Sequence, residues 1–257
     1  MSASERLVQT KPLHSNHHEL HVSHYSDLFT IQGESICCES IIAKGEHVFV
    51  GISPFNSRFS KEYIRDVINW SLVKFTQVDI LMPSVDEASR LLVATGYSEE
   101  KAKRKTQREL RRHKKYLDEL LSSSVVYRNV RAIDFSDYLD SKHYNTLIKQ
   151  VEKAFEEDEI FKQSCLNMSR QALLGRLKGV GKGEAELTDA GIQIALPYIF
   201  AELPFYLNTP QILNVPSSTL IYHRPWPIGK DLYAGKYLLK IGENQSYGVI
   251  QPTTISR

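Results

Sequence analysis

Hydrophobic positions along the chain form short runs that alternate with longer amphipathic segments. Residues 47–52 (HVFVGI) and 78–83 (VDILMP) are typical of buried strands. Apolar side chains at helical spacing in residues 60–75, behind an initial serine, predict a helix between these strands. Residues 85–97 predict a second helix, which a glycine closes. This alternation of strand and helix indicates a parallel sheet with crossover helices.

The rest of the chain continues the alternation. The same patterns predict helices over residues 98–121, 136–155, 157–176 and 187–206, and strands over residues 125–133, 218–223, 237–241 and 247–252. Together the elements indicate an α/β protein with a Rossmann-like, mostly parallel sheet flanked by helices. We expect residues 1–40 to form a polar, partly ordered N-terminal arm. The remaining residues, 41–257, are numerous enough for one domain with its own core.

Positive charge is concentrated in one of the predicted helices. Residues 101–115 (KAKRKTQRELRRHKK) contain nine Lys or Arg and one Glu, a local charge of +8, so the net charge of +2 leaves 2 − 8 = −6 for the remainder. At about 100° per residue, six of these cations fall within one stripe of the helix. The six are Lys101, Arg104, Arg108, Arg111, Arg112 and Lys115. Such a stripe suits a phosphate backbone, and it favours a nucleic-acid partner over an ordinary solvated helix face.

Cysteine usage and hydropathy indicate a cytoplasmic protein with no membrane partner. The three cysteines, Cys37, Cys38 and Cys165, form neither a disulfide framework nor a metal-type spacing. The first twenty residues are polar and lack the apolar core of a signal peptide, and we find no run of 18 apolar residues. We therefore expect a cytoplasmic localisation.

Two other segments raise the question of a bound ligand. Residues 17–24 (HHELHVSH) could place three imidazoles on one helical face as metal ligands, but we favour a weakly ordered arm or a first strand and expect no metal. Residues 177–186 (LKGVGKGEAE) depart from a phosphate-binding loop, because Arg176 stands six positions before Lys182 where a glycine is required. In addition, Gly183 replaces the magnesium-binding hydroxyl residue. We interpret this segment as a linker between helices and expect no cofactor.

Candidate chemistry lies at the ends of two predicted strands. Ser53 directly follows the strand at residues 47–52, on the rim where doubly wound folds bind ligands. A serine in that place is more often a cap or turn residue than a nucleophile. Tyr222 and His223 end the strand at residues 218–223, and they form either a rim hydrogen bond or a proton-handling pair beside an acyl centre.

A carboxylate in an apolar helix is a further candidate. Tyr198 and Glu202 are four residues apart and therefore share one helical face, within the apolar sequence ALPYIFAELPFY. A carboxylate in such surroundings needs a partner, because burying an unpaired charge is costly. The partner is either an ammonium group on a ligand or an ordinary Arg or Lys of the protein. Both alternatives stay open at this point.

Several of these segments together resemble one enzyme family. HVFVGISPFNSRFS (47–60), the basic helix, YIFAE (198–202) and SSTLIYH (217–223) occur in this order in cyclodipeptide synthases, and the chain is similar to that family from about residue 45 to residue 250. The fold of the family resembles the catalytic domain of class Ic aminoacyl-tRNA synthetases. The resemblance implies a tRNA-dependent aminoacyltransferase that takes two aminoacyl-tRNAs and forms a cyclic dipeptide without ATP, metal or cofactor.

The resemblance also implies roles for individual residues. Ser53 is similar to the nucleophile that receives the first aminoacyl group in a ping-pong reaction through acyl-enzyme and dipeptidyl-enzyme stages. Glu202 and Tyr198 resemble the pair that holds its α-ammonium group. Tyr222 resembles the residue that positions the acyl group and relays protons, and the basic stripe would bind the tRNA.

Further matches concern the subfamily and the substrate pocket. Asn56, Tyr222 and His223 match the three positions that define the NYH subfamily. The positions that resemble pocket-lining residues of the family are Phe49, Gly51, Leu81, Phe205 and Tyr206, with Phe205 nearer the first aminoacyl pocket than Tyr206.

The apolar pocket positions favour a hydrophobic product. GISPFNSRFS (51–60) most resembles members of the family that use leucine, so we expect cyclo(Leu-Leu) and a monomeric enzyme. Two alternatives remain from the sequence. A serine hydrolase or small-molecule acyltransferase would use Ser53 and leave the basic stripe unexplained. A non-catalytic tRNA-binding module would use the stripe and leave Ser53, Tyr198, Glu202 and Tyr222 without a role.

Overall fold

A six-stranded sheet forms the centre of the protein in the computed structural model, which describes residues 25–179 and 181–253. From one edge to the other the strands are β1 (Phe29–Gly33), β6 (Gln245–Pro252), β5 (Ser218–Tyr222), β2 (His47–Gly51), β3 (Gln77–Met82) and β4 (Val130–Asp134). The edge strand β1 pairs antiparallel with β6, and all other neighbours are parallel. The mostly parallel Rossmann-like sheet predicted from the sequence is confirmed.

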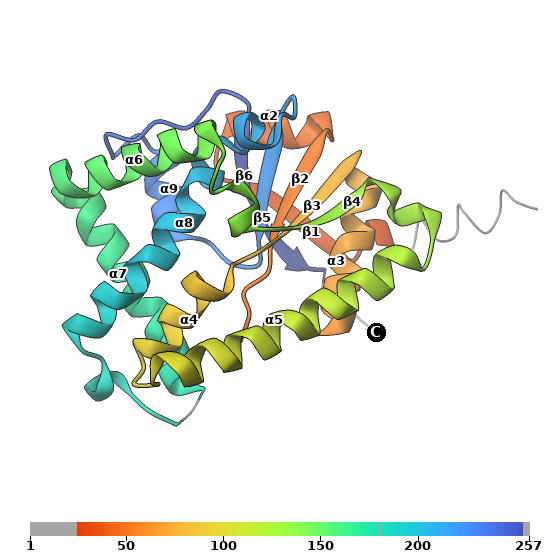
Figure 1. Cartoon of the computed structure of the whole chain (residues 1–257). Coiled ribbons are helices and arrows are strands. Elements are labelled where there is room, and N and C mark those ends of the chain that lie inside the picture. The colour runs from red at the N-terminus through yellow and green to blue at the C-terminus, as the bar shows by residue number, and fades with distance from the viewer. Residues whose placement is uncertain (1–24, 180, 254–257) are drawn as a thin grey trace, which may run out of the picture.

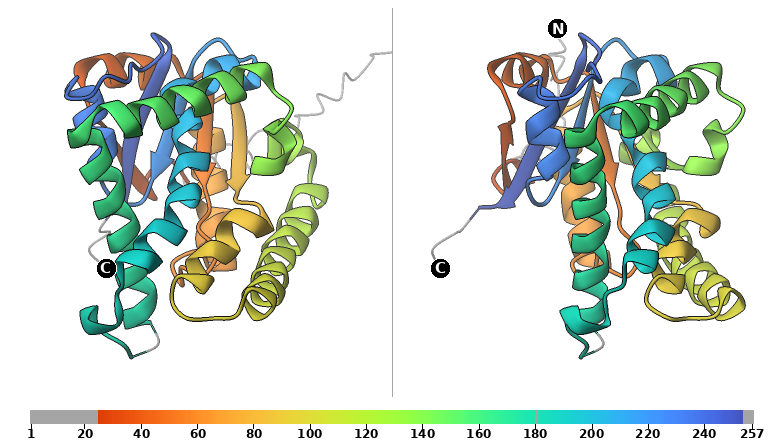
Figure 2. Two further views of the ribbon diagram at one scale, coloured as in Figure 1. Left: turned by 60° about the vertical axis from the view of Figure 1, so that its left-hand side comes forward. Right: turned by 90° about the vertical axis from the view of Figure 1, so that its left-hand side faces the viewer.

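Helices surround this sheet (Figures 1 and 2). The α-helices are α2 (Ile36–Lys44), α3 (Lys61–Lys74), α4 (Val85–Val93), α5 (Glu99–Ser122), α6 (Lys142–Glu157), α7 (Glu159–Lys178), α8 (Asp189–Leu213) and α9 (Pro227–Tyr233). Short 3-10 turns are η1 (Val125–Asn129), η2 (Phe135–Tyr138) and η3 (Glu184–Glu186). Ser60 caps α3 as its sequence predicts, since its hydroxyl accepts a hydrogen bond from the Tyr63 amide at 3.2 Å.

The two faces of the sheet support two hydrophobic cores, because side chains alternate along each strand. Val48 and Val50 of β2 point to one face and pack with residues of α3 and with Leu117 of α5. Phe49 and Leu220 point to the other face and pack with residues of α4, α6, α7, α8 and α9. A sheet covered on both faces explains why the strand sequences are continuous apolar runs.

Some predicted elements differ from the structure. Residues 237–241 form no strand, because the Leu238 amide donates to Asp158 at 2.9 Å and the Tyr237 hydroxyl donates to Ser164 at 2.9 Å. Residues 125–129 form the turn η1 instead of the first half of a strand. The sequence patterns did not reveal β1, α2 or α9, and residue 40, where we placed the end of the N-terminal arm, lies inside α2. The histidine-rich residues 17–24 are outside the described part of the chain.

Helix α8 is long and apolar enough to cross a membrane, by its length and composition alone. In the structure, however, 67% of an apolar 18-residue stretch of this helix is buried inside the protein. The helix contains Pro197, Pro204 and Pro210 and bends at Asn208, whose backbone is not helical. It packs with residues of α4, α6 and α7, so its apolar sequence is that of a central core helix.

A buried polar network lies at the amino ends of the strands. His47 starts β2 and forms hydrogen bonds through both ring nitrogens. Its Nδ1 lies 2.8 Å from the Ser218 hydroxyl, and its Nε2 lies 3.1 Å from the Asp79 carboxylate. Asp79 also accepts from the Arg131 guanidinium, with an Nε–Oδ1 distance of 2.8 Å. Ser218, His47 and Asp79 thus form a Ser-His-Asp arrangement from three adjacent strands, β5, β2 and β3. Ser218 is fully buried and lies at the amino ends of the strands, whereas Ser53 follows the carboxyl end of β2. We therefore interpret this arrangement as structural and not catalytic.

Candidate active site

A tight turn after β2 places Ser53. The strand pairing continues to Ile52, whose amide donates to the Leu81 carbonyl at 2.9 Å. The chain then reverses, with the Asn56 amide donating to the Ser53 carbonyl at 3.3 Å. Pro54 is the second residue of this turn and Phe55 the third, with a positive φ of 70°. These are the features of a type II turn, in which a side chain other than Gly or Asn at the third position is strained. The turn fixes Ser53 at the carboxyl end of β2.

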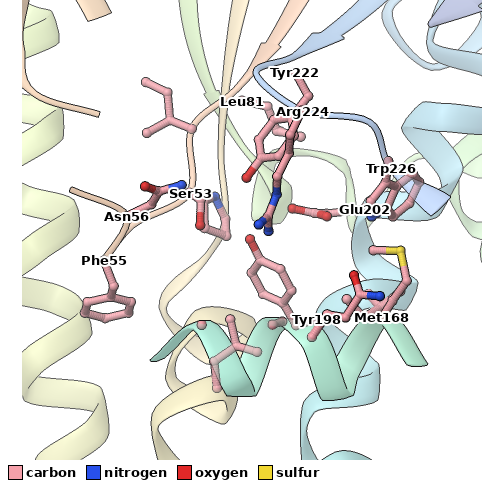
Figure 3. A pocket seen from close by; sticks show the side chains of 18 of the residues that line it. Ser53, Phe55, Asn56, Leu81, Met168, Tyr198, Glu202, Tyr222, Arg224 and Trp226 are labelled. Carbon is pink, nitrogen blue, oxygen red and sulfur yellow. The ribbon is translucent and has the colours of Figure 1, made fainter. Parts of the chain in front are cut away.

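A cavity of about 560 Å³ opens beside this turn. Ser53, Tyr198, Glu202, Tyr222 and Asn56 all line it, although they come from three distant parts of the sequence. In Figure 3 the Tyr198 hydroxyl and the Glu202 carboxylate point toward the space in front of Ser53. Ser53 and Glu202 therefore face one shared cavity, as a reaction that uses both side chains requires.

Helix α8 supplies the acidic wall of the cavity. Tyr198, Glu202 and Tyr206 follow one another at intervals of four residues and all line the cavity. A side-chain hydrogen bond joins Tyr198 to Glu202. Burial raises the pKa of Glu202 to about 7, against the opposing effects of the Tyr198 hydrogen bond and the nearby Arg176 cation. Burial also raises the pKa of Tyr198 well above its ordinary value, so its hydroxyl keeps its proton.

The end of β5 supplies the opposite wall. Burial raises the pKa of Tyr222 to about 12, and a side-chain hydrogen bond joins this tyrosine to Asn56. His223 is different, because it is not one of the residues that line the cavity. Its ring packs edge-on against Phe59 at 5.5 Å between centroids, and burial followed by the charges of Arg58 and Arg224 lowers its pKa to about 4. His223 is thus a neutral supporting side chain behind Tyr222.

The predicted pocket positions divide in the same way. Phe49, Gly51, Leu81 and Tyr206 line the cavity. Phe205, which we expected to face an aminoacyl pocket, does not line this cavity. Its ring is fully buried in an aromatic cluster behind the wall. The rings around it, at centroid distances of 5.1 to 5.9 Å, are Phe49, Phe135, Tyr138 and Tyr144.

Two arginines of the cavity were not anticipated. Arg176, near the end of α7, lines the cavity and interacts electrostatically with Tyr198, Tyr222 and Glu202. Arg224 follows β5, and Figure 3 shows its side chain reaching toward Glu202. The signal that could have identified Arg224 is its place directly after the Tyr222-His223 pair. Nothing in the sequence around Arg176 indicates its burial, because only the packing of α7 on α8 creates it.

The basic stripe is on the solvent side of α5. All six of its cations are exposed, while the buried residues of the helix lie on the opposite face. Three of the six have carboxylate partners, and two of these partners, Glu100 and Glu119, lie outside the counted residues 101–115. Arg104 pairs with Glu100 at 2.9 Å, Lys115 pairs with Glu119 at 3.7 Å, and Arg112 pairs with Glu109. Among the described residues, the ion pairs leave Lys101, Arg108 and Arg111 without a carboxylate.

The described residues offer neither a metal-binding cluster nor a histidine base in the cavity. Among them, no group of three or more His, Cys, Asp or Glu side chains could hold a metal ion. No histidine belongs to the described residues that line the cavity, so Ser53 has no imidazole base in reach there. The arrangement is a serine beside a half-buried carboxylate, three protonated tyrosines and two arginines. It suits covalent acyl transfer from a substrate that carries its own activation and its own amine.

Comparison with known proteins identifies the family behind this arrangement. A family model described as cyclodipeptide synthase matches residues 29–252. The chain belongs to the cyclodipeptide synthase family. It is 53% identical over 226 residues to the cyclo(L-leucyl-L-leucyl) synthase of Photorhabdus laumondii, covering 88% of this chain and 97% of that protein. It is 39% identical over 215 residues to the protein of the same name from Bacillus subtilis, covering 83% and 86%.

Solved structures of cyclodipeptide synthases have the same fold. The enzyme from Bacillus thermoamylovorans superimposes with a TM-score of 0.83 at 38% identity, covering 90% of this chain and 99% of that one. A Mycobacterium tuberculosis protein superimposes with a TM-score of 0.77 at 27% identity, covering 88% and 94%. That protein is described as demonstrating that cyclodipeptide synthetases are related to type I tRNA synthetases. The predicted likeness to a synthetase catalytic domain is thereby confirmed.

Proposed function

We propose that this enzyme joins two leucyl groups, delivered as leucyl-tRNA, into cyclo(Leu-Leu) through an ester on Ser53. The observation that carries the proposal is the single cavity that Ser53, Tyr198, Glu202 and Tyr222 share in a member of this family. Leucine is supported by the names of the two relatives above and by apolar walls from Phe49, Leu81 and other residues. The substrate class is the aminoacyl-tRNA that the family uses.

The first step exchanges one ester for another. The Ser53 oxygen attacks the leucyl carbonyl, a new bond forms between that oxygen and the acyl carbon, and the terminal ribose hydroxyl of the tRNA leaves with a proton. No further energy source is required, because the aminoacyl ester is already activated. Tyr222 keeps its proton at neutral pH, so it serves as a donor and relay beside the leaving oxygen.

Glu202 provides the orientation. In the free enzyme its pKa of about 7 leaves it partly protonated near neutrality. An α-ammonium group in the cavity would stabilise the ionised form and donate a charge-assisted hydrogen bond to it. With the amine held by Glu202 and Tyr198, the acyl carbon is directed at Ser53. Positioning of this kind contributes up to about 7–11 kcal/mol to catalysis.

The second half of the reaction consumes the enzyme ester. The α-ammonium group of the Ser53-bound leucyl ester gives a proton to the Glu202 carboxylate, and the resulting amine attacks the carbonyl of a second leucyl-tRNA. A peptide bond forms, the bond from that acyl carbon to the ribose oxygen breaks, and the second tRNA leaves with a proton from the amine. A dipeptidyl ester remains on Ser53. The free amine of that dipeptide then attacks the ester carbonyl. A second peptide bond forms, the bond to the Ser53 oxygen breaks, and the ring leaves with Ser53 regenerated.

The remaining expectations belong to the same proposal. The exposed cations of α5 bind the tRNA backbone, Asn56, Tyr222 and His223 mark an NYH-type member, and the enzyme acts as a cytoplasmic monomer without metal or cofactor. Support for the tRNA contact comes from the exposure of all six stripe cations. A serine hydrolase is less well supported, because no histidine is among the described residues that line the Ser53 cavity.

Product analysis tests the proposal directly. The protein is expressed in bacteria, the medium is analysed for cyclic dipeptides by mass spectrometry, and Ser53→Ala is run beside the wild type. We expect cyclo(Leu-Leu) from the wild type and none from Ser53→Ala. Purified wild type incubated with leucyl-tRNA should also accumulate a leucyl ester that Ser53→Ala cannot form. Product that persists in Ser53→Ala, or no cyclic dipeptide from the wild type, would refute the proposal.

A further inference from the structure

A second cavity, of about 600 Å³, adjoins the Ser53 cavity. The two cavities share Phe55, Gly175, Arg176 and Gly179 in their walls. Its volume is within the roughly 300–1,000 Å³ of small-ligand sites. The junction is open at Gly175, where a Cβ added to the backbone would meet no atom within 4 Å.

The second cavity is strongly cationic. Lys101, Lys105, Arg176 and Lys182 line it, and no acidic residue does so among the described residues of its wall. Tyr97 holds two of these cations, with the Lys105 ammonium 4.8 Å and the Lys101 ammonium 5.3 Å from its ring centroid. Lys105 also donates to the Tyr97 hydroxyl at 3.2 Å. The cations are therefore ordered by an aromatic ring and still need an anion.

Arg176 is the clearest sign of a missing ligand. Its Nε is buried and has no hydrogen-bond partner, a costly condition for a guanidinium donor. Its guanidinium carbon lies 5.0 Å from the ring centroid of Phe55, the residue strained at a φ of 70°. Strained backbone held in place beside an unpaired buried donor is typical of a binding site. Both residues stand at the junction of the two cavities.

We propose that the second cavity binds the 3′-terminal nucleotides of the acyl donor, with Lys105 and Arg176 contacting backbone phosphate and the aromatic rings of Tyr97 and Phe55 contacting bases. This inference rests on the proposed function and adds a subsite to it. The geometry favours it because the cavity lies between the basic helix α5 and Ser53, where the end of an RNA strand must pass. Stacking rings with adjacent cations are the usual means of holding single-stranded RNA.

Competition by short RNA fragments tests the subsite. Cyclo(Leu-Leu) formation from leucyl-tRNA is measured with unacylated CpCpA or with adenosine as the inhibitor. Lys105→Gln should raise the inhibition constant of CpCpA by about tenfold, the effect of removing one charge-assisted hydrogen bond. The inhibition constant of adenosine, which has no phosphate, should stay unchanged. Lys149→Gln on α6 is the matched control and should leave CpCpA inhibition unchanged. Arg108→Gln on the outer stripe should weaken the use of leucyl-tRNA, but it should leave the inhibition constant of CpCpA unchanged.

Each other result has a definite meaning. An unchanged inhibition constant in Lys105→Gln overturns the subsite while leaving the proposed function intact. Equally weakened inhibition by adenosine and CpCpA would show that Lys105 maintains the cavity rather than contacts phosphate, and would overturn the phosphate assignment. An equal effect of Arg108→Gln would move the fragment to the outer stripe and overturn the subsite as well. A wild type that makes no cyclic dipeptide from leucyl-tRNA contradicts the proposed function itself.

Discussion

At the scale of residues, the ionisation of Glu202 controls what the site can hold. Burial gives its carboxylate a pKa of about 7, so at neutral pH the free enzyme has both forms available. The tyrosines beside it, Tyr198 and Tyr222, keep their protons because burial raises their pKa values too. The cavity therefore presents one group that titrates near neutrality between donors that do not. A ligand amine is the natural counterpart of such a group.

Glu202→Gln tests this role. The ionised carboxylate exists above pH 7 and is lost as the pH falls below it, so kcat/KM of the wild type should rise with pH through about 7. Glu202→Gln should lower kcat/KM by roughly 10- to 100-fold and should lack this limb of the profile, since a hydrogen bond to a charged group is worth about 1.5–3 kcal/mol. Its melting temperature at pH 8 should not fall, because a half-buried carboxylate charge is removed. A variant that retains the wild-type profile would show that another group holds the amine.

Elements differ in how well the sequence revealed them. The strands β2 and β3 and the helices α3 and α5 carry their periodicity in contiguous residues, and their predicted ranges agree with the structure to within one or two residues. The edge strand β1 alternates apolar and polar residues (FTIQG), but this pattern covers only five residues inside a segment that we interpreted as a polar arm, and the strand pairs with β6 alone. The same limit applies to sites. Ser53 and Glu202 lie on predictable elements, while the burial of Arg176 depends on packing between distant segments.

Helix α5 has two faces with different tasks. Ala102, His113 and Leu117 are buried, and the exposed stripe lies on the other side of the helix. Within the stripe, Arg108 and Arg111 have no carboxylate partner among the described residues, whereas Arg104 is paired with Glu100. The unpaired cations are free to replace counterions of a phosphate backbone. They should therefore contribute more to tRNA binding than the paired one.

Neutralising the stripe tests this division. Arg108→Gln with Arg111→Gln should raise KM for leucyl-tRNA with little change in kcat, and should reduce the slope of log affinity against log salt by about one for each phosphate that the variant no longer neutralises. Arg104→Gln should have a smaller effect, because its charge is already balanced by Glu100. Lys149→Gln on α6 is the control for a general change in charge. Steady-state kinetics and filter binding between about 50 and 200 mM salt give the measurement. Equal effects at Arg104 and Arg108 would remove the distinction between paired and unpaired cations.

At the scale of the whole molecule, the residues of the cavity and a stabilising polar network lie at opposite ends of the strands of one sheet. The carboxyl ends of β2 and β5 hold Ser53 and Tyr222 beside the cavity. At the amino ends, the buried network of His47, Asp79 and Ser218 joins three adjacent strands, and Arg131 of β4 extends it. A change at the amino ends should therefore affect the free energy of unfolding, and a change at the carboxyl ends should affect catalysis.

Asp79→Asn tests this separation through pH. Burial tends to raise the pKa of Asp79, but its hydrogen bonds to His47 and Arg131 outweigh burial and lower it. For a lowered pKa, the stabilisation is complete above the unfolded value of about 3.9 and is lost as the pH falls through the folded value. At pH 7 the variant should lose about 3 kcal/mol of unfolding free energy, the lower end of the range for breaking a buried pair, because half of the Arg131 side chain is exposed. Urea denaturation at pH 7 and below pH 4 should show this difference shrinking in acid, while Glu152→Gln, a change at an exposed carboxylate of α6, shows none. The folded variant should retain the wild-type kcat/KM, and a loss of activity larger than the loss of folded protein would mean that the two ends of the strands are coupled through the sheet.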